Sequence, residues 1–556
     1  MHKRFLPWAL ASAFTLSCTA AADTLLVRAA QIHTLDPDHP QAQALLIEDA
    51  RIRAVGNFDE LRKAHPQART VDLGEATVLP GLIDAHGHVL GLGLALSRVD
   101  LVGTRDKAEV IARLKAHEQK LPEAGSWLLG RGWDQNDWAG EAKRFPSASD
   151  LDEAFPDRPV VLERVDGHAT WINTAAMARI SRSLDGNWQP EGGRIERDDV
   201  GQATGILIDA ASAFIESKLP AVTATERKRA YRLAFAQLLA AGLTGVHDAG
   251  TSLEDLAVLQ ELADAGELPL RLTAMADGDG AALARLCKEG LYAHPSGRLN
   301  MRTVKLYADG ALGSRGAALL ADYSDAHGNQ GLLVMSEPAL RKAIGKAAKC
   351  GVQVATHAIG DRANRLVLDL YEALAGPDKR GRRRWRIEHA QVLAPEDLGR
   401  FASLGVIASM QPTHATSDMP WAAARLGPQR VLGAYAWRDL REAGTRLALG
   451  SDFPVESHQP LLGLAAAISR QDRTDQPAGG WYPNQRLTTF EAVRGFTADA
   501  AWAGFAENEV GQLKAGMRAD FVVLARDPLG LQRGSALADI EVEQTWVDGV
   551  PVYRRR

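Results

Sequence analysis

The feature that most constrains the fold is a unit that recurs from about residue 226 onward: an amphipathic helix, a glycine and an apolar strand. Residues 226–241 lead through Gly242 into the apolar run LTGVHDAG, and the same succession occurs at Gly351, Gly405 and Gly444. Glycine just after a helix supplies the left-handed residue that ends it, and helices that alternate with buried strands imply parallel βαβ units. This half of the chain is therefore predicted to contain a parallel sheet covered by helices.

Four further apolar segments bring the predicted parallel strands to eight. They are VLPGLIDAHGH from residue 78, LPLRLTAMADG from 268, MRTVKLYADG from 301 and RRWRIEHAQV from 383. Eight such units predict a (β/α)8 barrel over residues 81–505. In a barrel of this kind, the catalytic side chains gather at the C-terminal ends of the strands.

Two parts of the chain depart from this rhythm. Residues 89 to about 225 contain a helical segment, a Trp- and Gly-rich stretch and an apolar strand, and we expect an α+β insertion after the first barrel strand, placed to roof the active site. Residues 23–80 and 506–556 read as short strands with turns, so both ends are predicted to build one small β-sandwich. The predicted fold class is α/β, a TIM barrel with these two additions.

The first 22 residues have the pattern of a cleavable secretory signal: a basic start, an apolar centre and an Ala20-x-Ala22 ending. The mature chain is expected to begin near Asp23, in the periplasm. The apolar run is shorter than the roughly 20 residues that a membrane anchor needs. Thr15 stands three residues before Cys18, where a lipoprotein signal usually has a bulky aliphatic residue. Neither stable membrane insertion nor lipid attachment is expected.

Charge and cysteine content narrow the class of partner. The formal net charge is -5 over 556 residues, so we expect a small-molecule substrate rather than a nucleic acid. After the signal, only Cys287 and Cys350 remain. An oxidising compartment permits a disulfide, but two cysteines form no framework, and both are interpreted as buried small side chains. A homodimer is the default expectation.

Ionisable side chains stand at the C-terminal ends of five predicted strands. They are His86 and His88 on the first strand, Lys305 on the fourth, His357 on the fifth, His389 on the sixth and Asp452 on the eighth. Taken singly, each has a structural explanation, because a histidine can be a hydrogen-bonded rim residue, an aspartate can cap a helix and a lysine can extend to solvent. Their shared position in a barrel favours one metal site.

The ordered motifs PGLIDAHGH, THAIGD, IEHAQ and GSDFPVE, with the strand that holds Lys305, resemble the amidohydrolase superfamily of metal-dependent hydrolases. More narrowly, GRGWDQNDW, RVDGHATWIN, KLYADGALGSRGAAL and GQLKAGMRADFVVLARDPL resemble its YtcJ-like branch, amidohydrolase family 3, which includes N-substituted formamide deformylase-like enzymes. The resemblance covers almost the whole mature chain. In the first strands, RAAQIHT and EDARI stand where the family often has a glycine, which affects turns only.

The resemblance implies a binuclear metal centre and a role for each ligand. It implies that His86 and His88 bind the more buried ion with Asp452 beside it, that His357 and His389 bind the second ion, and that Lys305 bridges both as a carbamate. A carbamate offers two anionic oxygens, whereas an ammonium has no lone pair for a metal. Zinc suits imidazole with carboxylate-type oxygen, and Mn, Fe, Co and Ni remain alternatives, as does a single ion.

The implied reaction is hydrolysis of a carbon–nitrogen bond other than a peptide bond in a small amide-type molecule, such as an N-formyl or N-acyl compound. The metal lowers the pKa of its bound water from about 15.7 toward about 7, the resulting hydroxide attacks the carbonyl, and Asp452 passes a proton to the leaving nitrogen. Deamination, or hydrolysis of an ester, carbamate or cyclic ureide, uses the same hydroxide and stays an alternative. A non-enzymatic binding protein would lack ligands, and none is missing.

Seven side chains near the predicted centre are candidate substrate contacts. They are Trp133, Asp134, His168, Trp171, Asp309, Arg315 and His414. Arg315 has the forked geometry to bind a substrate carboxylate or carbonyl. Asp309 serves equally well to form a tight turn with Gly310. The two tryptophans are either walls of a pocket or plain core packing, and the sequence leaves this open.

Overall fold

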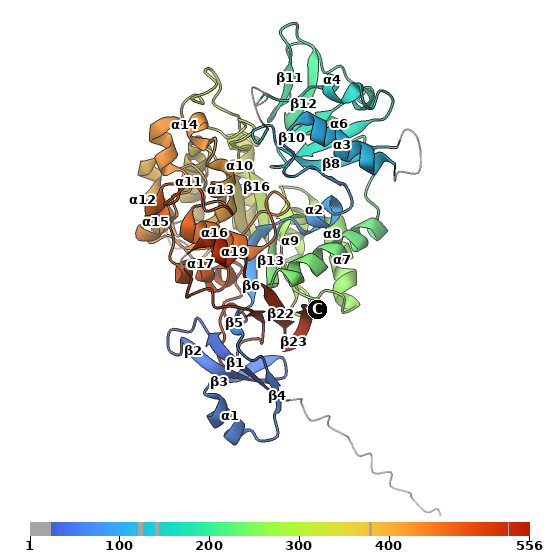
Figure 1. Ribbon diagram of the computed structural model, residues 1–556. Coiled ribbons are helices and arrows are strands. Elements are labelled where there is room, and N and C mark those ends of the chain that lie inside the picture. Colours follow the sequence, from blue (N-terminus) through green and yellow to red (C-terminus); the bar gives the residue numbers. More distant parts are fainter. Residues whose placement is uncertain (1–23, 120–125, 139–143, 377–380, 532) are drawn as a thin grey trace, which may run out of the picture.

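The computed structural model (Figure 1) describes residues 24–119, 126–138, 144–376, 381–531 and 533–556. The predicted signal over residues 1–22, with Cys18, lies outside these residues. Three sheets organise the described chain: a barrel sheet, a sheet in the insertion and a sheet shared by both ends of the chain. No helix in the described ranges combines the length and apolarity that a membrane crossing requires.

Eight parallel strands form the barrel, each at a predicted strand. They are β6 (Leu82–Gly87), β13 (Leu243–Thr251), β14 (Arg271–Asp277), β16 (Leu299–Tyr307), β17 (Gln353–Ala358), β18 (Arg386–His389), β19 (Ile407–Met410) and β20 (Leu447–Leu449). They pair in chain order, and a parallel bridge from Gly87 to Phe453 links the first strand to the segment after the last. The short β15 (Tyr292–Ala293) pairs with β16. The predicted (β/α)8 barrel is confirmed.

Helices cover the outside of this barrel and share with it the largest apolar core. They include α7 (Ala224–Ala240), α8 (Leu253–Asp264), α9 (Ala281–Glu289), α10 (Glu337–Cys350), α11 (Asp361–Ala375), α12 (Pro395–Leu404), α13 (Pro412–Asp418), α14 (Ala422–Arg430), α15 (Trp437–Glu442), α16 (Pro460–Ser469), α17 (Thr489–Gly495), α18 (Ala498–Ala503) and α19 (Gly534–Ala538). Gly351 and Gly405 end α10 and α12 in the left-handed conformation, with φ values of 73° and 66°. Because other residues are strained there, glycine at these positions fixes where each helix gives way to the next strand.

The insertion forms a separate six-stranded sheet above the C-terminal ends of the barrel strands (Figure 1). Its spatial order is β7 (Val99–Asp100), β8 (Leu128–Trp133), β9 (Val160–Arg164), β10 (Ala169–Ile172), β12 (Ala203–Asp209) and β11 (Gly193–Arg197). The pairs from β7 to β9 are parallel and the others antiparallel. Its helices, after α2 (Val89–Ala95), are α3 (Lys107–Glu118), α4 (Ala148–Asp152), α5 (Thr174–Met177) and α6 (Ala213–Glu216). The predicted α+β insertion is therefore present.

Both ends of the chain meet in one mixed sheet at the opposite side of the barrel. It contains β1 (Leu25–His33), β2 (Gln41–Glu48), β3 (Arg51–Gly56), β4 (Arg69–Asp72), β5 (Thr77–Pro80), β21 (Phe521–Leu524), β22 (Val542–Val547) and β23 (Val550–Arg554), with α1 (Phe58–Ala64) beside it. Strand β21 pairs with β5, which joins the two ends in one continuous hydrogen-bonded sheet. Arg271 of the barrel forms ion pairs with Asp520 and Asp548 of this sheet.

Cys287 and Cys350 form a disulfide, which corrects the prediction that they are two separate buried side chains. The bond connects α9 to the last residue of α10, across 63 residues of sequence. The two helices are neighbours on the outside of the barrel. Disulfides persist mainly in oxidising compartments.

Candidate metal centre

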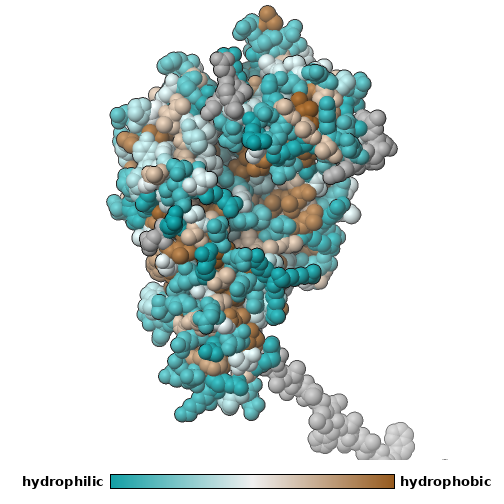
Figure 2. All heavy atoms as spheres, viewed as in Figure 1, coloured by the Kyte–Doolittle hydropathy of each residue, from teal (hydrophilic) through white to brown (hydrophobic). Residues whose placement is uncertain are grey.

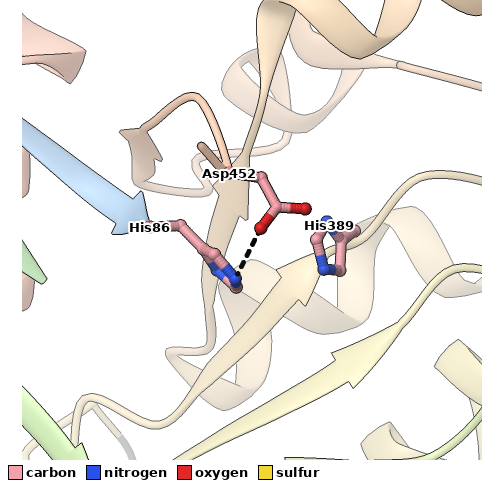
Figure 3. A group of neighbouring side chains, drawn as sticks. All are labelled: His86, His389 and Asp452. Atoms are coloured by element: carbon pink, nitrogen blue, oxygen red, sulfur yellow. Dashed lines mark ion pairs between the residues drawn. The ribbon is translucent and has the colours of Figure 1, made fainter. Parts of the chain in front are cut away.

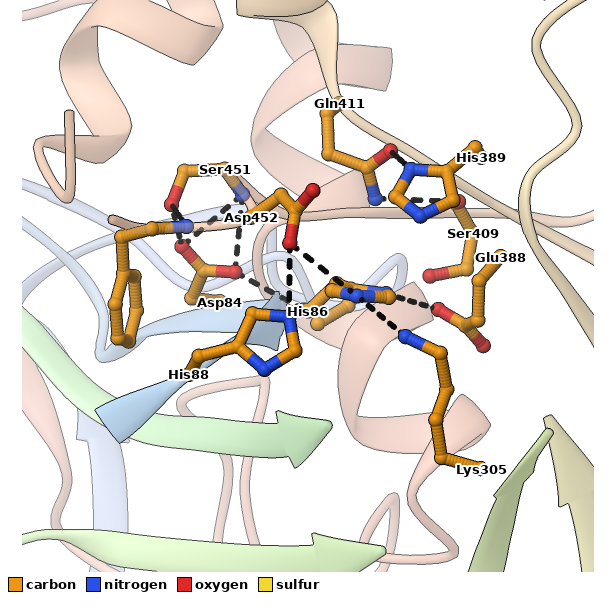
Figure 4. Close-up of polar contacts among 12 residues, drawn as sticks. Asp84, His86, His88, Lys305, Glu388, His389, Ser409, Gln411, Ser451 and Asp452 are labelled. Carbon is orange, nitrogen blue, oxygen red and sulfur yellow. Dashed lines mark hydrogen bonds and ion pairs between the residues drawn. The ribbon is translucent and has the colours of Figure 1, made fainter. Parts of the chain in front are cut away.

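The six predicted metal ligands lie together at the C-terminal ends of the barrel strands, and Figure 4 shows five of them. They are His86, His88, Lys305, His357, His389 and Asp452. The ring centroid of His389 lies 4.9 Å from that of His86 and 4.6 Å from that of His357. Lys305 Nζ lies 3.1 Å from His86 Nε2. The strand ends thus bring the predicted set to one place.

Three of these residues, His86, His389 and Asp452, form the tightest group (Figure 3). One ligand atom from each lies within 4.8 Å of the others, and all three residues are buried. Asp452 Oδ1 is buried and accepts no well-aligned hydrogen bond from the described residues, although His88 Nε2 is 3.1 Å away. A buried carboxylate oxygen is costly unless a donor or a cation satisfies it. The nitrogen and oxygen set therefore fits a divalent metal ion.

The protonation states of these groups suit metal binding. Burial lowers the pKa of His86 to about 4 and lowers the pKa values of His357 and His389 well below the ordinary value, so each imidazole keeps a lone pair. Burial alone would raise the pKa of Asp452, but the neighbouring His86 and the nearby His88 hold it well below its usual range. Burial also lowers the pKa of Lys305.

Two side chains orient the imidazoles (Figure 4). Glu388 Oε2 lies 2.5 Å from His86 Nδ1, and Gln411 Oε1 lies 2.8 Å from His389 Nδ1. Because a neutral imidazole donates from one ring nitrogen only, these contacts leave the Nε2 lone pair of each ring for a metal. Arg386 in turn donates to both oxygens of Glu388, at 2.5 and 2.9 Å.

Neither Glu388 nor Gln411 is among the residues predicted from the sequence. The signal for Glu388 is the pair Arg386 and Glu388, two opposite charges two residues apart in a strand that the barrel prediction buries. At that spacing both side chains point to the same face of the strand. Burying two charges carries a desolvation cost, so a buried pair of this kind indicates a functional role. Gln411, directly after β19, gives no comparable signal.

Glu388→Gln is expected to weaken zinc binding by about 10- to 100-fold, because the amide keeps the shape and the hydrogen bond but loses the negative charge that makes the His86 imidazole a stronger ligand. Competition with a chromophoric chelator measures the dissociation constant. Glu507→Gln is the matched control, since Glu507 also pairs with an arginine, Arg384, but contacts no predicted ligand. An unchanged zinc affinity in Glu388→Gln would show that the charge of Glu388 does not contribute to metal binding.

A cavity of about 670 Å³ opens over the centre, which is large enough for a drug-sized molecule. Three predicted substrate contacts line it: Asp134 and His168 of the insertion and His414 of the barrel. Leu96 and Val102, which are 48% and 53% exposed, also line the cavity. Figure 2 shows apolar side chains gathered on the face between the insertion and the barrel. The insertion therefore covers the centre, as predicted.

His168 and His414 differ in their surroundings. Burial alone would lower the pKa of His168, but its hydrogen bond with Asp209 raises that pKa to about 9. The His414 ring stacks on the His389 ring, with centroids 5.8 Å apart, and its Nε2 lies 3.8 Å from Asp452 Oδ2. Both imidazoles thus stand beside predicted ligands rather than within the tightest group.

Trp133 and Trp171 do not line the cavity. Both are fully buried in the apolar core of the insertion, where their ring centroids are 5.8 Å apart. The Nε1 of each donates to a backbone carbonyl, at 2.9 and 2.8 Å. Of the two interpretations left open by the sequence, the structure favours core packing.

Asp309 and Arg315 do not line the cavity either. The Asp309 carboxylate is buried and accepts backbone N–H groups of Ala318, Ile359 and Gly360 at 2.8 to 2.9 Å. Burial raises the pKa of Asp309 to about 7. Arg315 pairs instead with Asp325, at 3.0 Å. The structure therefore does not support substrate contact by either residue, because Asp309 joins the loops after β16 and β17 and Arg315 is paired within the loop after β16.

Comparison with known proteins extends over nearly the whole chain. The chain is 33% identical to the putative amidohydrolase YtcJ of Bacillus subtilis, over 94% of this chain and 98% of that protein. It is 29% identical to the N-substituted formamide deformylase of Arthrobacter pascens, over 96% of this chain and 98% of that protein.

A solved structure of an uncharacterized metal-dependent hydrolase from Pyrococcus horikoshii has a TM-score of 0.74 and 27% identity, covering 92% of this chain and 99% of that one. An imidazolonepropionase-like composite domain matches residues 44–68 only. The amidohydrolase family matches residues 69–553, which span the barrel, the insertion and the part of the terminal sheet from β4 onward. With this match added to the barrel and to the ligand set at its mouth, the chain belongs to the amidohydrolase family.

Proposed function

We propose that this protein hydrolyses an amide-type carbon–nitrogen bond of a small molecule, with N-formyl and N-acyl compounds as the first candidates. The observation that carries the proposal is the buried group of His86, His389 and Asp452, which faces a cavity of about 670 Å³. The likeness to a relative named N-substituted formamide deformylase supports the type of bond.

The proposed cofactor is a pair of divalent ions, with zinc as the first choice and Mn, Fe, Co or Ni as alternatives. When bound, such an ion lowers the pKa of coordinated water from about 15.7 toward about 7 and polarises a carbonyl group. The proposed ligands of one ion are His86, His88 and Asp452, and those of the other are His357 and His389.

The proposed bridge between the ions is a carbamate on Lys305. The lysine is 1% exposed, and its Nζ lies 3.1 Å from His86 Nε2, in the midst of the other candidate ligands. Burial lowers its pKa, which favours the uncharged amine. Only the uncharged amine has the lone pair that forms the N–C bond with carbon dioxide, and loss of a proton then gives the anion.

Asp452 is the proposed proton carrier. Its ionised carboxylate can take a proton from the attacking water, and the same proton then goes to the nitrogen as the carbon–nitrogen bond breaks. The His88 Nε2 contact at 3.1 Å orients the carboxylate for this transfer. The products are a carboxylic acid and an amine, with no redox change.

We further propose that the protein works in the periplasm. The signal pattern of residues 1–22 supports export, and the Cys287–Cys350 disulfide is in keeping with an oxidising compartment. We also propose a homodimer, because twofold dimers are the commonest assemblies of soluble proteins.

Zinc-loaded protein is expected to hydrolyse at least one compound of a panel of N-formyl amines, N-acyl amino acids and aryl amides. Removal of the metal by a chelator should lower the rate by about 100-fold or more, and added zinc should restore it, because the metal supplies both the nucleophile and the polarised carbonyl. Amine and formate or acid release are measured by chromatography. Release of ammonia instead would favour the deaminase alternative, and protein that binds less than about a tenth of an ion per chain in added zinc would contradict metal catalysis.

A further inference from the structure

The insertion directs one imidazole, that of His168, into the cavity, and holds the carboxylate of Asp209 against it. His168 directly precedes β10 and Asp209 ends β12, and these two strands are antiparallel neighbours. The backbone N–H of Asp209 donates to the carbonyl of His168 at 3.0 Å, and Asp209 Oδ1 lies 2.6 Å from His168 Nδ1. The sheet thus places the two side chains together at one end of these two interior strands.

The barrel fixes the position of Asp209. The Asp209 side chain is 2% exposed, and its φ of 49° lies in the left-handed region that a residue with a side chain rarely adopts. Its carboxylate packs against two glycines in the loop after β16: a Cβ at Gly310 or Gly316 would come within 2.5 or 2.7 Å of Oδ2. The absence of a side chain at these glycines makes room for a carboxylate from the insertion, next to the strand that carries Lys305.

His168 lies beside the proposed metal ligands. Its ring centroid is 5.2 Å from that of His357, and both residues line the cavity. The Nδ1 of His168 is hydrogen-bonded to Asp209, and no residue in the described parts of the chain forms a hydrogen bond with its Nε2. Nε2 is therefore the ring nitrogen left for a bound molecule.

We propose that His168 is a catalytic residue supplied by the insertion, whose Nε2 hydrogen-bonds the amide group of the substrate, and that Asp209 is its positioning residue. The proposal rests on the hydrolase function proposed above. It gives the insertion a part in the reaction beyond covering the centre, because removal of the insertion would remove a substrate contact from the site.

Two substitutions of His168 separate the roles of its ring nitrogens. The amide nitrogen of asparagine takes about the place of Nδ1 and keeps the contact with Asp209, whereas that of glutamine takes about the place of Nε2. His168→Asn should lower kcat/KM by about 10²- to 10³-fold, as loss of a hydrogen bond to a reacting group does. His168→Gln should recover about tenfold or more of that loss. Both variants should keep the zinc content and the zinc affinity of the wild type.

A second His–Asp pair provides the matched control. His294 Nε2 lies 3.0 Å from Asp264 Oδ1, outside the cavity, so His294→Asn should leave kcat/KM unchanged. Thermal unfolding checks that each variant is folded.

Three results would overturn the proposal: His168→Asn within about threefold of the wild type, equal losses in the asparagine and glutamine variants, or loss of zinc from both variants. The last result would make His168 a metal ligand. A zinc-loaded wild type that hydrolyses no amide would instead refute the proposed function itself, and this inference with it.

Discussion

Lys305→Ala is expected to lower kcat/KM by at least about 10³-fold and to remove at least one metal ion per chain. Lys305 is buried, with its Nζ 3.1 Å from His86 Nε2, and without a carbamate it would bring a positive charge or an unpaired amine to the proposed metal centre. In the proposed carbamate form it would supply two anionic oxygens between the two proposed ions. Alanine removes that bridge, so both activity and metal content should fall together.

The measurements are steady-state kinetics and elemental analysis of the purified variant. Lys346→Ala is the matched control, because Lys346 pairs with Asp279 on the protein surface and should leave both quantities unchanged. A Lys305→Ala variant with full metal content and unimpaired turnover would refute the bridging role.

Two further tests ask whether the bridge is a carbamate. Apo-protein reconstituted with zinc in buffer freed of carbon dioxide should regain less activity than the same protein with added bicarbonate. A short carboxylate such as acetate should restore part of the activity of Lys305→Ala, since it offers two oxygens to the same position. Full reconstitution without carbon dioxide would leave Lys305 as a structural residue.

The barrel was predictable because its signals are local. Each helix that ends at a glycine and leads into an apolar strand can be recognised from a short stretch of sequence. Gly351 and Gly405 confirm this, because both adopt the left-handed conformation that ends a helix. The terminal sheet, by contrast, depends on pairing between strands that are far apart in the sequence. The pairing of β5 with β21 joins residues more than 400 positions apart, so the sequence predicts that both ends contribute strands but not that they form one continuous sheet.

In the site, too, the features set by local position were predictable and those set by distant contacts were not. The six proposed ligands stand at strand ends, where the barrel topology alone fixes their direction. The roles of Asp309 and Arg315 depend on partners from other loops, and those of Trp133 and Trp171 depend on which side of the insertion sheet is buried. The Cys287–Cys350 bond likewise depends on the adjacency of α9 and α10. Such facts arise only from tertiary packing.

Asp452→Asn is expected to keep most of the bound metal but to lower kcat by about 10³-fold. Asparagine retains an oxygen that can face a metal, whereas its amide cannot take a proton from water. In the wild type, His86 and His88 hold the pKa of Asp452 well below its usual range, so the carboxylate stays ionised throughout the neutral range and any acid limb of the pH profile arises from another group.

Metal content and kcat of Asp452→Asn, measured on the same sample, separate the two roles of this residue. Asp325→Asn is a control, since Asp325 pairs with Arg315 away from the cavity. If metal and turnover fall in equal proportion, Asp452 acts as a ligand alone, and if both persist, another group must carry the proton. The expected result, metal without turnover, would leave the proton path as the only function lost. His414, whose Nε2 is 3.8 Å from Asp452 Oδ2 and which is not a proposed ligand, would then be the next histidine to test on that path.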